Sequence, residues 1–150
     1  MQNVFDAQDA QEYINRINNL TPETQRKWGK MSVDQVLAHL NVAYDLTFTP
    51  EKFPKPSFIA KFLLSKFVKP KITNEIPYKQ SLPTSPVFII ADERNFEEEK
   101  AKLIGNIQRV QQLGREAFEG KENINFGKMT AQCWNNMFAK HLNHHLDQFG

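Results

Sequence analysis

The chain has 150 residues, a formal net charge of +2 at pH 7, a hydrophobic content of 40% and a charged content of 24%. This length indicates a single soluble domain over residues 1–150, with a core large enough to fold without disulfides. We expect no membrane partner, because no apolar run approaches the roughly 20 residues of a spanning helix. We also expect no nucleic-acid partner, because no basic stripe carries interleaved aromatic residues.

The first residues, MQNVFDAQDAQEY, are polar and lack the basic and apolar regions of a secretory signal. Cys133 is the only cysteine, which excludes an internal disulfide and is typical of a reducing compartment. We therefore expect a cytoplasmic protein.

The first predicted helix runs from about Gln8 to about Asn18, where apolar residues recur at helical spacing. It ends before Pro22, because proline cannot continue a helix. The second helix follows the stretch WGKM and runs from Ser32 to about Phe48. Its serine can act as the N-cap, and a glutamine three residues later completes the pattern of a capping box.

Residues 49–86 contain seven of the eight prolines, and their only apolar patch is FIAKFLLSKFV. We predict a long crossover with one short helix near Phe58 to Val68. Basic residues mixed with Phe and Leu over residues 57–69 are compatible with an anionic membrane surface, but Lys66 interrupts the apolar side. We therefore favour a lid over one end of the helices, or a dimer surface, for this segment.

Residues 91–118 have apolar positions at helical spacing, with acidic residues leading and basic residues following, which suits a helix dipole. The last helix follows the stretch FGKM, and Thr130 is placed as its cap. These segments together predict an all-α protein.

Three of the four histidines, His141, His144 and His145, lie in the last helix. His141 and His145 are four residues apart and so share one helix face. Both fall near the middle of the apolar side of this helix, which is formed by the apolar residues from Trp134 to Phe149. A buried imidazole needs a polar partner, and one shared metal ion would serve as the partner of both rings. His144 lies at the edge of this arc, where water or an outer contact is expected.

His39 lies on the flank of the second helix, where it can face a neighbouring helix. Three neutral imidazoles that leave positions open are typical of a catalytic rather than a structural metal site. The alternative is that an H-x3-H pair arises by chance. We favour the metal interpretation, because the pair is centred on the buried face and the remaining histidine is also helical.

Other catalytic patterns are absent or weak. The sequence contains no Ser-His-Asp arrangement, no G-x-S-x-G nucleophile elbow and no phosphate-binding loop. Cys133 lies two turns before His141, so a nucleophilic role stays an alternative, although a buried structural cysteine is commoner. No catalytic residue beyond the predicted metal ligands is assigned.

The stretches RKWGKMSVDQVLAHLN and FGKMTAQCWNNMFAKHLNHHLDQFG resemble the DinB-like superfamily, which includes the YfiT-type metal-dependent hydrolases. They are most similar to a bacterial branch with a W-G-K-M opening and an H-L-x-H-H-L-x-Q-F-G close. The resemblance implies a homodimer and a four-helix bundle of up-down-down-up connection. It also implies a divalent metal, often nickel or zinc, held at the positions of His39, His141 and His145. His144 does not match a ligand that the family pattern names.

Relatives in that superfamily include transferases that attach low-molecular-weight thiols to electrophiles, and a mycothiol-dependent isomerase. The resemblance therefore implies a metal-dependent thiol transferase or hydrolase acting on a small molecule. A non-catalytic metal-binding or dimerisation protein is the alternative. For an enzyme we expect an open metal position facing a cavity lined by Tyr44 and Trp134, with Gln148 as an outer partner and the helix near Phe58 to Val68 over its mouth.

Overall fold

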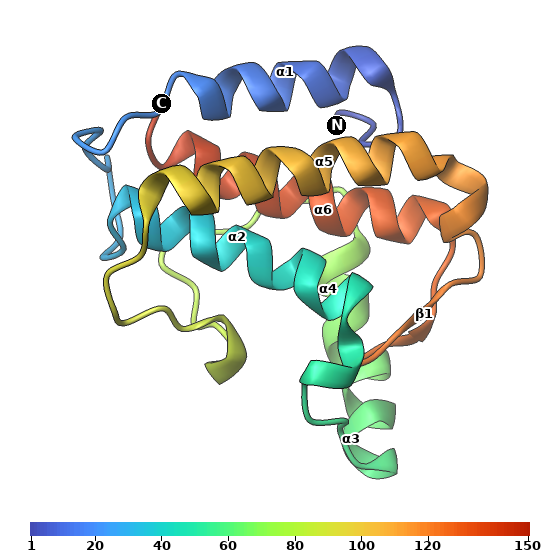
Figure 1. Cartoon of the computed structure of the whole chain (residues 1–150). Helices are drawn as coiled ribbons and strands as arrows, with labels where there is room; N and C mark the ends of the chain where they lie inside the picture. Colours follow the sequence, from blue (N-terminus) through green and yellow to red (C-terminus); the bar gives the residue numbers. More distant parts are fainter.

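The structure is a computed structural model that describes residues 1–150, and it consists mostly of α-helices (Figure 1). The long helices α1, α2, α5 and α6 lie side by side; α1 and α6 run in one direction, and α2 and α5 run in the other. Their bounds are Ala7–Asn18 for α1, Val33–Phe48 for α2, Phe96–Phe118 for α5 and Ala131–Asp147 for α6. None of the helices combines the length and the apolarity needed to cross a membrane. The predicted all-α class is confirmed.

Two of these helices begin where the capping signals of the sequence predict. Ser32 precedes α2, and its backbone N–H donates to Oε1 of Gln35 at 3.0 Å, as in a capping box. Thr130 precedes α6, and its Oγ1 accepts from the backbone N–H of Cys133 at 3.2 Å. Local side-chain chemistry therefore sets the start of both helices that carry the candidate site.

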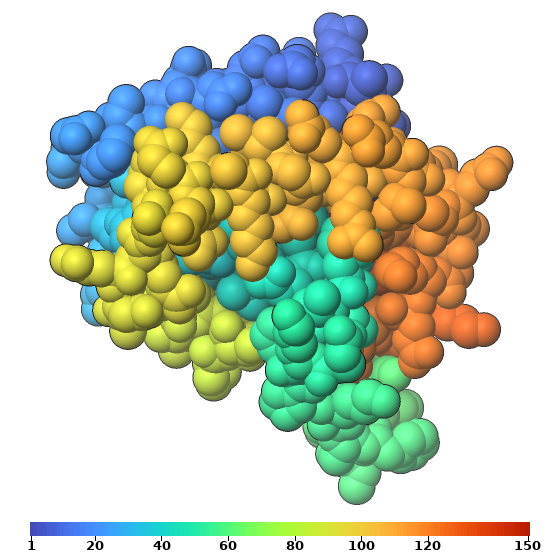
Figure 2. Space-filling view, viewed as in Figure 1, coloured from blue at the N-terminus to red at the C-terminus, as the bar shows by residue number.

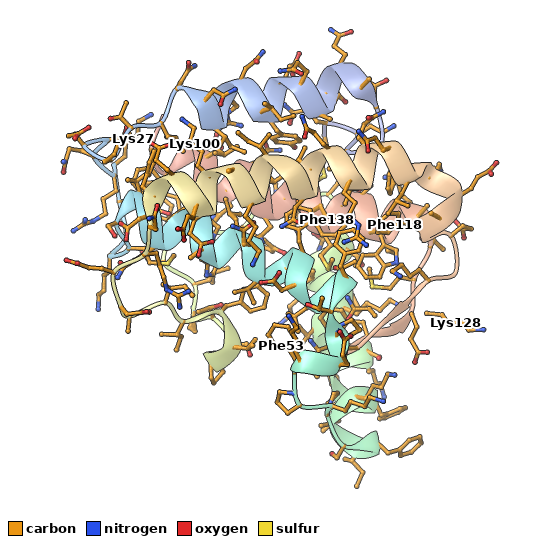
Figure 3. The ribbon with its side chains drawn as sticks, viewed as in Figure 1. Lys27, Phe53, Lys100, Phe118, Lys128 and Phe138 are labelled. Carbon is orange, nitrogen blue, oxygen red and sulfur yellow. The ribbon has the colours of Figure 1, made fainter.

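The core between the long helices is rich in aromatic side chains. Phe118 and Phe138 stand together in this core (Figure 3), with ring centroids 6.2 Å apart. The ring of Tyr44 stacks on Phe138 with centroids 4.7 Å apart, and Trp134 packs on Phe138 at 5.8 Å. Tyr44 is 2% exposed and Trp134 is fully buried. The prediction that these two residues line an open cavity at the metal is wrong, because their rings fill the core.

Helix α6 is buried on nearly all sides, including at polar positions. The N-terminal segment covers Asn135, whose Oδ1 accepts from the backbone N–H of Val4 at 2.7 Å. The middle of the crossover covers Lys140, which donates to the carbonyl of Lys71 at 2.7 Å and to the side chain of Asn74 at 2.8 Å. No buried side-chain nitrogen or oxygen lacks a partner, so these polar groups are buried without the cost of an unmade hydrogen bond.

The crossover between α2 and α5 is built of short helices. Its elements are η1 (Pro50–Lys52), α3 (Phe58–Leu63), the π-helical turn η2 (Leu64–Val68), α4 (Lys69–Thr73) and η3 (Pro86–Phe88). α3, η2 and α4 follow one another without a break, so the predicted short helix exists and extends further than expected. α3, at its start, projects away from the long helices (Figures 1 and 2), whereas α4, at its end, packs against α6. α3 therefore does not form the predicted lid, and the alternative of a dimer surface stays a prediction.

A small hairpin joins α5 to α6, and no pattern in the sequence predicts it. Its strands β1 (Glu122–Asn123) and β2 (Gly127–Lys128) pair antiparallel. The regular backbone of α5 breaks near its end at Gly114, which has a φ of +75°, a conformation that glycine adopts without strain. Strands of two residues carry too few positions to show the alternation by which strands are recognised.

Candidate metal centre

Three histidines converge where α2 packs against α6. His39 comes from α2, and His141 and His145 come from successive turns on one face of α6. One nitrogen of each ring lies within 4.8 Å of the corresponding nitrogens of the other two, and Nε2 of His39 is 2.9 Å from Nε2 of His141. His39 is 4% exposed and His145 is 7% exposed. The fold thus brings together all three residues that the sequence predicts as ligands.

Hydrogen bonds from outside this cluster fix the orientation of two of its rings. Nδ1 of His39 donates to the carbonyl oxygen of Phe88 at 2.8 Å, since a carbonyl can only accept. Nε2 of Gln148 donates to the carbonyl of Trp28 at 2.7 Å, which leaves Oε1 of Gln148 to accept from Nδ1 of His145 at 3.1 Å. Both histidines therefore carry their proton on Nδ1 and turn the Nε2 lone pair toward the cluster. Gln148 holds the outer position that the sequence predicts.

The contact between His39 and His141 tests whether the cluster suits a metal ion. Because Nε2 of His39 has a lone pair and no proton, its 2.9 Å contact requires either a proton on His141 or a cation between the two nitrogens. Two nitrogens bound to one ion at about 2.0 to 2.1 Å lie about 2.9 to 3.4 Å apart when the angle at the ion is about 90° to 110°. The observed distance lies in this range. The nitrogen set spans up to 4.8 Å, so the third ring would have to move about 1.4 Å closer to reach this range.

The donor set fits a divalent metal without specifying which one. All three ligand atoms are imidazole nitrogens, and no carboxylate or thiolate belongs to the cluster. Imidazole suits zinc, copper, iron and nickel. These histidines could therefore hold one metal ion, and the ligand types alone do not choose between nickel and zinc.

Burial sets the protonation state of the three rings. Burial lowers the pKa of His39, and burial together with the nearby His39 lowers the pKa of His145 to about 3. Burial also holds the pKa of His141 well below its usual range, and the neighbouring histidines add to this effect. All three rings are therefore neutral at pH 7, which is the form of imidazole that binds metals.

The stretch W-G-K-M packs directly on the outer partner of the cluster. Gly29 has a φ of +83°, and a Cβ on this residue would overlap Nε2 of Gln148. The backbone N–H of Lys27 donates to the carbonyl of Gln148 at 2.7 Å, and the ring of Trp28 lies edge-on to His144 with centroids 4.7 Å apart. The two segments that carry the family resemblance therefore meet in space, and the glycine permits their close approach.

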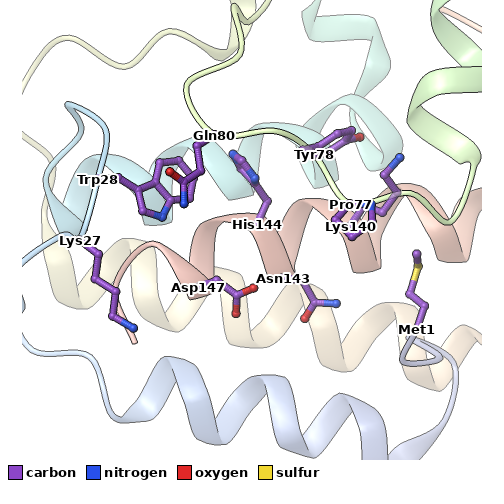
Figure 4. Close-up of a pocket in the computed structure, with 10 residues that line it drawn as sticks. All are labelled: Met1, Lys27, Trp28, Pro77, Tyr78, Gln80, Lys140, Asn143, His144 and Asp147. Atoms are coloured by element: carbon purple, nitrogen blue, oxygen red, sulfur yellow. The ribbon is translucent and has the colours of Figure 1, made fainter.

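His144 faces a pocket beside the cluster (Figure 4). This pocket has a volume of about 550 Å³, and its walls include Trp28, Tyr78 and Lys140. The ring of His144 also lies against that of His145, with centroids 4.8 Å apart. None of the three clustered histidines lines the pocket. His144 is therefore the side chain that joins the cluster to the pocket.

Phe88, rather than α3, covers the cluster. Its ring centroid lies 5.3 Å from that of His39 and 5.7 Å from that of His141. The prediction that the helix near Phe58 to Val68 covers the site is wrong, because that helix points away from α2 and α6 (Figure 1). No feature of the sequence distinguishes Phe88 from the other phenylalanines of the crossover, since its role depends on where a proline-rich chain returns across two helices.

Cys133 does not belong to the cluster, which contains only histidines. It is partly buried and packs at the edge of the core. Eight residues separate it from His141, which is about 12 Å along a helix axis. Its thiol therefore cannot act at the cluster, which removes the alternative of a cysteine nucleophile there.

Residues 2–150 match one protein family, described as "Protein of unknown function (DUF1569)". Because the match covers nearly the whole chain, the protein belongs to this family, which is DinB/YfiT-like. Comparison with the curated proteins and with the solved structures found no significant match.

Proposed function

We propose that the chain is a metal-dependent enzyme acting on a small molecule, either as an S-transferase of low-molecular-weight thiols or as a hydrolase. The observation that carries this proposal is the 2.9 Å contact between Nε2 of His39 and Nε2 of His141, with His145 beside them. We further propose that α1, α2, α5 and α6 form a DinB-like bundle of up-down-down-up connection, and that the protein is a homodimer.

His39, His141 and His145 would hold one divalent metal ion, for which we propose nickel or zinc. Three imidazoles fill only three of the four to six positions that such a metal prefers, so at least one position is left for solvent or substrate. A divalent metal would supply Lewis acidity, which makes a thiol or a water molecule a better nucleophile at neutral pH.

The residues around the cluster keep the ligand nitrogens in place. The Phe88 carbonyl holds the Nδ1 proton of His39, and Oε1 of Gln148 holds the Nδ1 proton of His145. Outer bonds of this kind fix the tautomer and the orientation of a ligating histidine. Their role in the proposed enzyme is positioning, because neither group contacts the pocket beside the cluster.

We place the substrate in the pocket that His144 shares with Trp28 and Tyr78. The aromatic rings offer apolar walls, and Lys27 adds an exposed positive charge at the rim. A small molecule with one apolar part and one anionic group matches these walls. His144 would then contact both the substrate and the ring of His145.

The second candidate function is a non-catalytic metal site that stabilises the fold or a dimer. The position of Phe88 favours it, since this ring covers His39 and His141 and no clustered histidine lines the pocket. In that case Phe88 would stay in place, and the metal would not exchange ligands with a substrate.

The first test is elemental analysis of protein purified without a histidine tag. The second is a thiol-transfer assay with an electrophilic acceptor and several thiols, comparing metal-loaded protein, chelator-stripped protein and the His145→Ala variant. We expect turnover in the metal-loaded protein alone. Equal rates in all three samples would overturn the transferase proposal. Stoichiometric metal with neither thiol transfer nor hydrolysis would favour the non-catalytic candidate.

A further inference from the structure

The outward face of the projecting helix exposes five large apolar side chains. Their exposed fractions are 88% for Phe58, 70% for Ile59, 57% for Phe62, 47% for Leu63 and 57% for Phe67. They lie on α3 and η2, which stand out from the body of the molecule (Figure 2). We call these five residues the apolar face. A contiguous exposed patch of this kind marks an interaction surface, because isolated soluble proteins seldom leave one uncovered.

The opposite side of the same helix is fixed to the body of the protein. Leu64 and Val68 pack against the core, so the helix has a buried side as well as an exposed one. Nζ of Lys61 contacts Glu122 at 2.7 Å, and Nζ of Lys69 donates to the carbonyl of Lys128 at 2.8 Å. The helix is thus held from behind by the β1–β2 hairpin, and its apolar face is presented outward by a defined set of contacts.

The surroundings of the apolar face are positively charged. Residues 52–74 contain six lysines and no aspartate or glutamate. Lys66 lies within the face, with its Nζ 6.0 Å from the Phe62 ring centroid and 5.5 Å from that of Phe67. Lys55 and Lys128 are also exposed, and Lys128 extends into solvent from strand β2 of the hairpin (Figure 3). Of this group, only Lys61 forms an ion pair with an acidic side chain.

We propose that the apolar face docks on an anionic lipid surface, with its phenylalanines inserted among the acyl chains and its lysines at the level of the headgroups. Long lysine side chains can place their stems along apolar surface while their ammonium groups stay in water. Clusters of lysine beside apolar residues are attracted to anionic lipids, and the two contributions reinforce each other. This surface is separate from the histidine cluster, and the inference does not rest on the proposed function. It replaces the sequence-based expectation of no membrane partner, because that expectation rested on the lack of a spanning helix and on Lys66, whose Nζ lies over the rings of the apolar face.

Charge decides between a lipid surface and a second copy of the chain. A two-fold contact pairs the same patch with itself. Such a contact through the apolar face would bring the unpaired Lys66 of one copy near that of the other, and like charges facing each other oppose association. An anionic surface instead complements Lys66 and the exposed Lys55, neither of which forms an ion pair within the chain.

The test is co-sedimentation of the full chain with two kinds of vesicle, pure phosphatidylcholine and a mixture of phosphatidylcholine with phosphatidylserine. We expect binding to the mixed vesicles only, and a loss of about tenfold or more when the salt concentration rises from low to well above physiological, because screening weakens attraction to the headgroups. The variants Phe58→Ser/Phe62→Ser and Lys55→Glu/Lys66→Glu should each lose about tenfold or more in binding.

The matched control is Leu113→Ser, which removes an exposed apolar residue on α5, away from the apolar face. It should bind like the unchanged protein, and unchanged circular dichroism would show that all variants fold. Failure to bind mixed vesicles overturns the proposal. If Phe58→Ser/Phe62→Ser instead converts a dimer to a monomer in sedimentation velocity without any effect on lipid binding, the occupant is a second copy and the proposal is equally overturned.

Discussion

The histidine cluster and the apolar face of α3 depart from the usual distribution of side chains in opposite directions. In the first region, polar imidazoles are buried between α2 and α6; in the second, phenylalanine, isoleucine and leucine point into solvent. Both regions are held by contacts on their far side, the cluster by Phe88 and Gln148 and the apolar face by the β1–β2 hairpin. The imidazole nitrogens turned inward could hold a metal ion inside the protein, whereas the apolar face turned outward is the basis of the lipid surface proposed above.

The two regions also show how much depends on the number of elements that cover a helix. α6 is covered by other segments on nearly every side, so even Lys140 and Asn135 are buried and hydrogen-bonded. α3 is covered on one side only, so the side chains on its other side face solvent. Equivalent apolar spacing therefore produces a core face in one helix and a free face in the other.

The largest expected effect concerns the polar region. His141→Ala should abolish stoichiometric metal binding, because this ring supplies one of three nitrogens and faces His39 at 2.9 Å. His144→Ala should leave binding nearly intact, since His144 faces the pocket. Isothermal titration with nickel and with zinc measures both. Equal losses in the two variants would show that the ligand pair is wrongly assigned.

The metal-free protein should lose stability on acidification. Each clustered histidine has a lowered pKa in the folded protein, so below about pH 6.5 the unfolded chain binds more protons. Stability is therefore present above that pH and is lost as the pH falls, by up to about 1.4 kcal/mol per pH unit for each histidine.

Urea unfolding between pH 7 and pH 5 measures this slope. His145→Gln should reduce this dependence of stability on pH by the contribution of one histidine. The reason is that His145, with a pKa of about 3 in the folded protein, stays neutral over this range while it gains a proton in the unfolded chain. A stability that does not change between these pH values would contradict the burial of neutral imidazoles.

Gly29→Ala should weaken metal binding without removing a ligand. A Cβ at Gly29 would displace the Gln148 amide, so Nδ1 of His145 would lose its hydrogen-bond acceptor. Loss of such an outer partner typically costs about 10- to 100-fold in metal affinity. Gly105→Ala is the matched control, because a Cβ there meets nothing within 4 Å. It should keep the affinity and raise stability by about 0.5 to 1 kcal/mol.

The smallest expected effect belongs to the apolar face. Phe58→Ser should change the free energy of unfolding by less than about 0.5 kcal/mol, because this side chain is 88% exposed. Leu64→Ala, on the inner side of the same helix, should cost about 1 kcal/mol or more, because Leu64 packs against the core. Chemical denaturation measures both. A large loss in Phe58→Ser would mean that the apolar face contributes to the fold.

The local features of this protein could be predicted from its amino-acid sequence. Helical spacing and caps located α1 and α2 to within a residue or two, and Thr130 located the start of α6. The interval of four residues between His141 and His145 placed both on the buried face, and the flank position of His39 on the second helix made it the third candidate, which the structure brings to them. These features follow from the geometry of a single helix, which repeats every 3.6 residues whatever surrounds it.

The segments that cover each helix could not be predicted from the sequence and became known from the folded chain. Periodicity reports which side of a helix is apolar, but the polar side of α6 is buried as well, because the N-terminal segment and residues 71–74 lie across it. The contact of Gln148 with Trp28 joins segments 120 residues apart, and Phe88 reaches His39 from a crossover without regular spacing. The exposure of the apolar side chains of α3 could not be predicted either, because it depends on which segments pack against that helix. Contacts between distant segments arise from packing of the whole chain, and no local pattern encodes which segment will arrive at a given face.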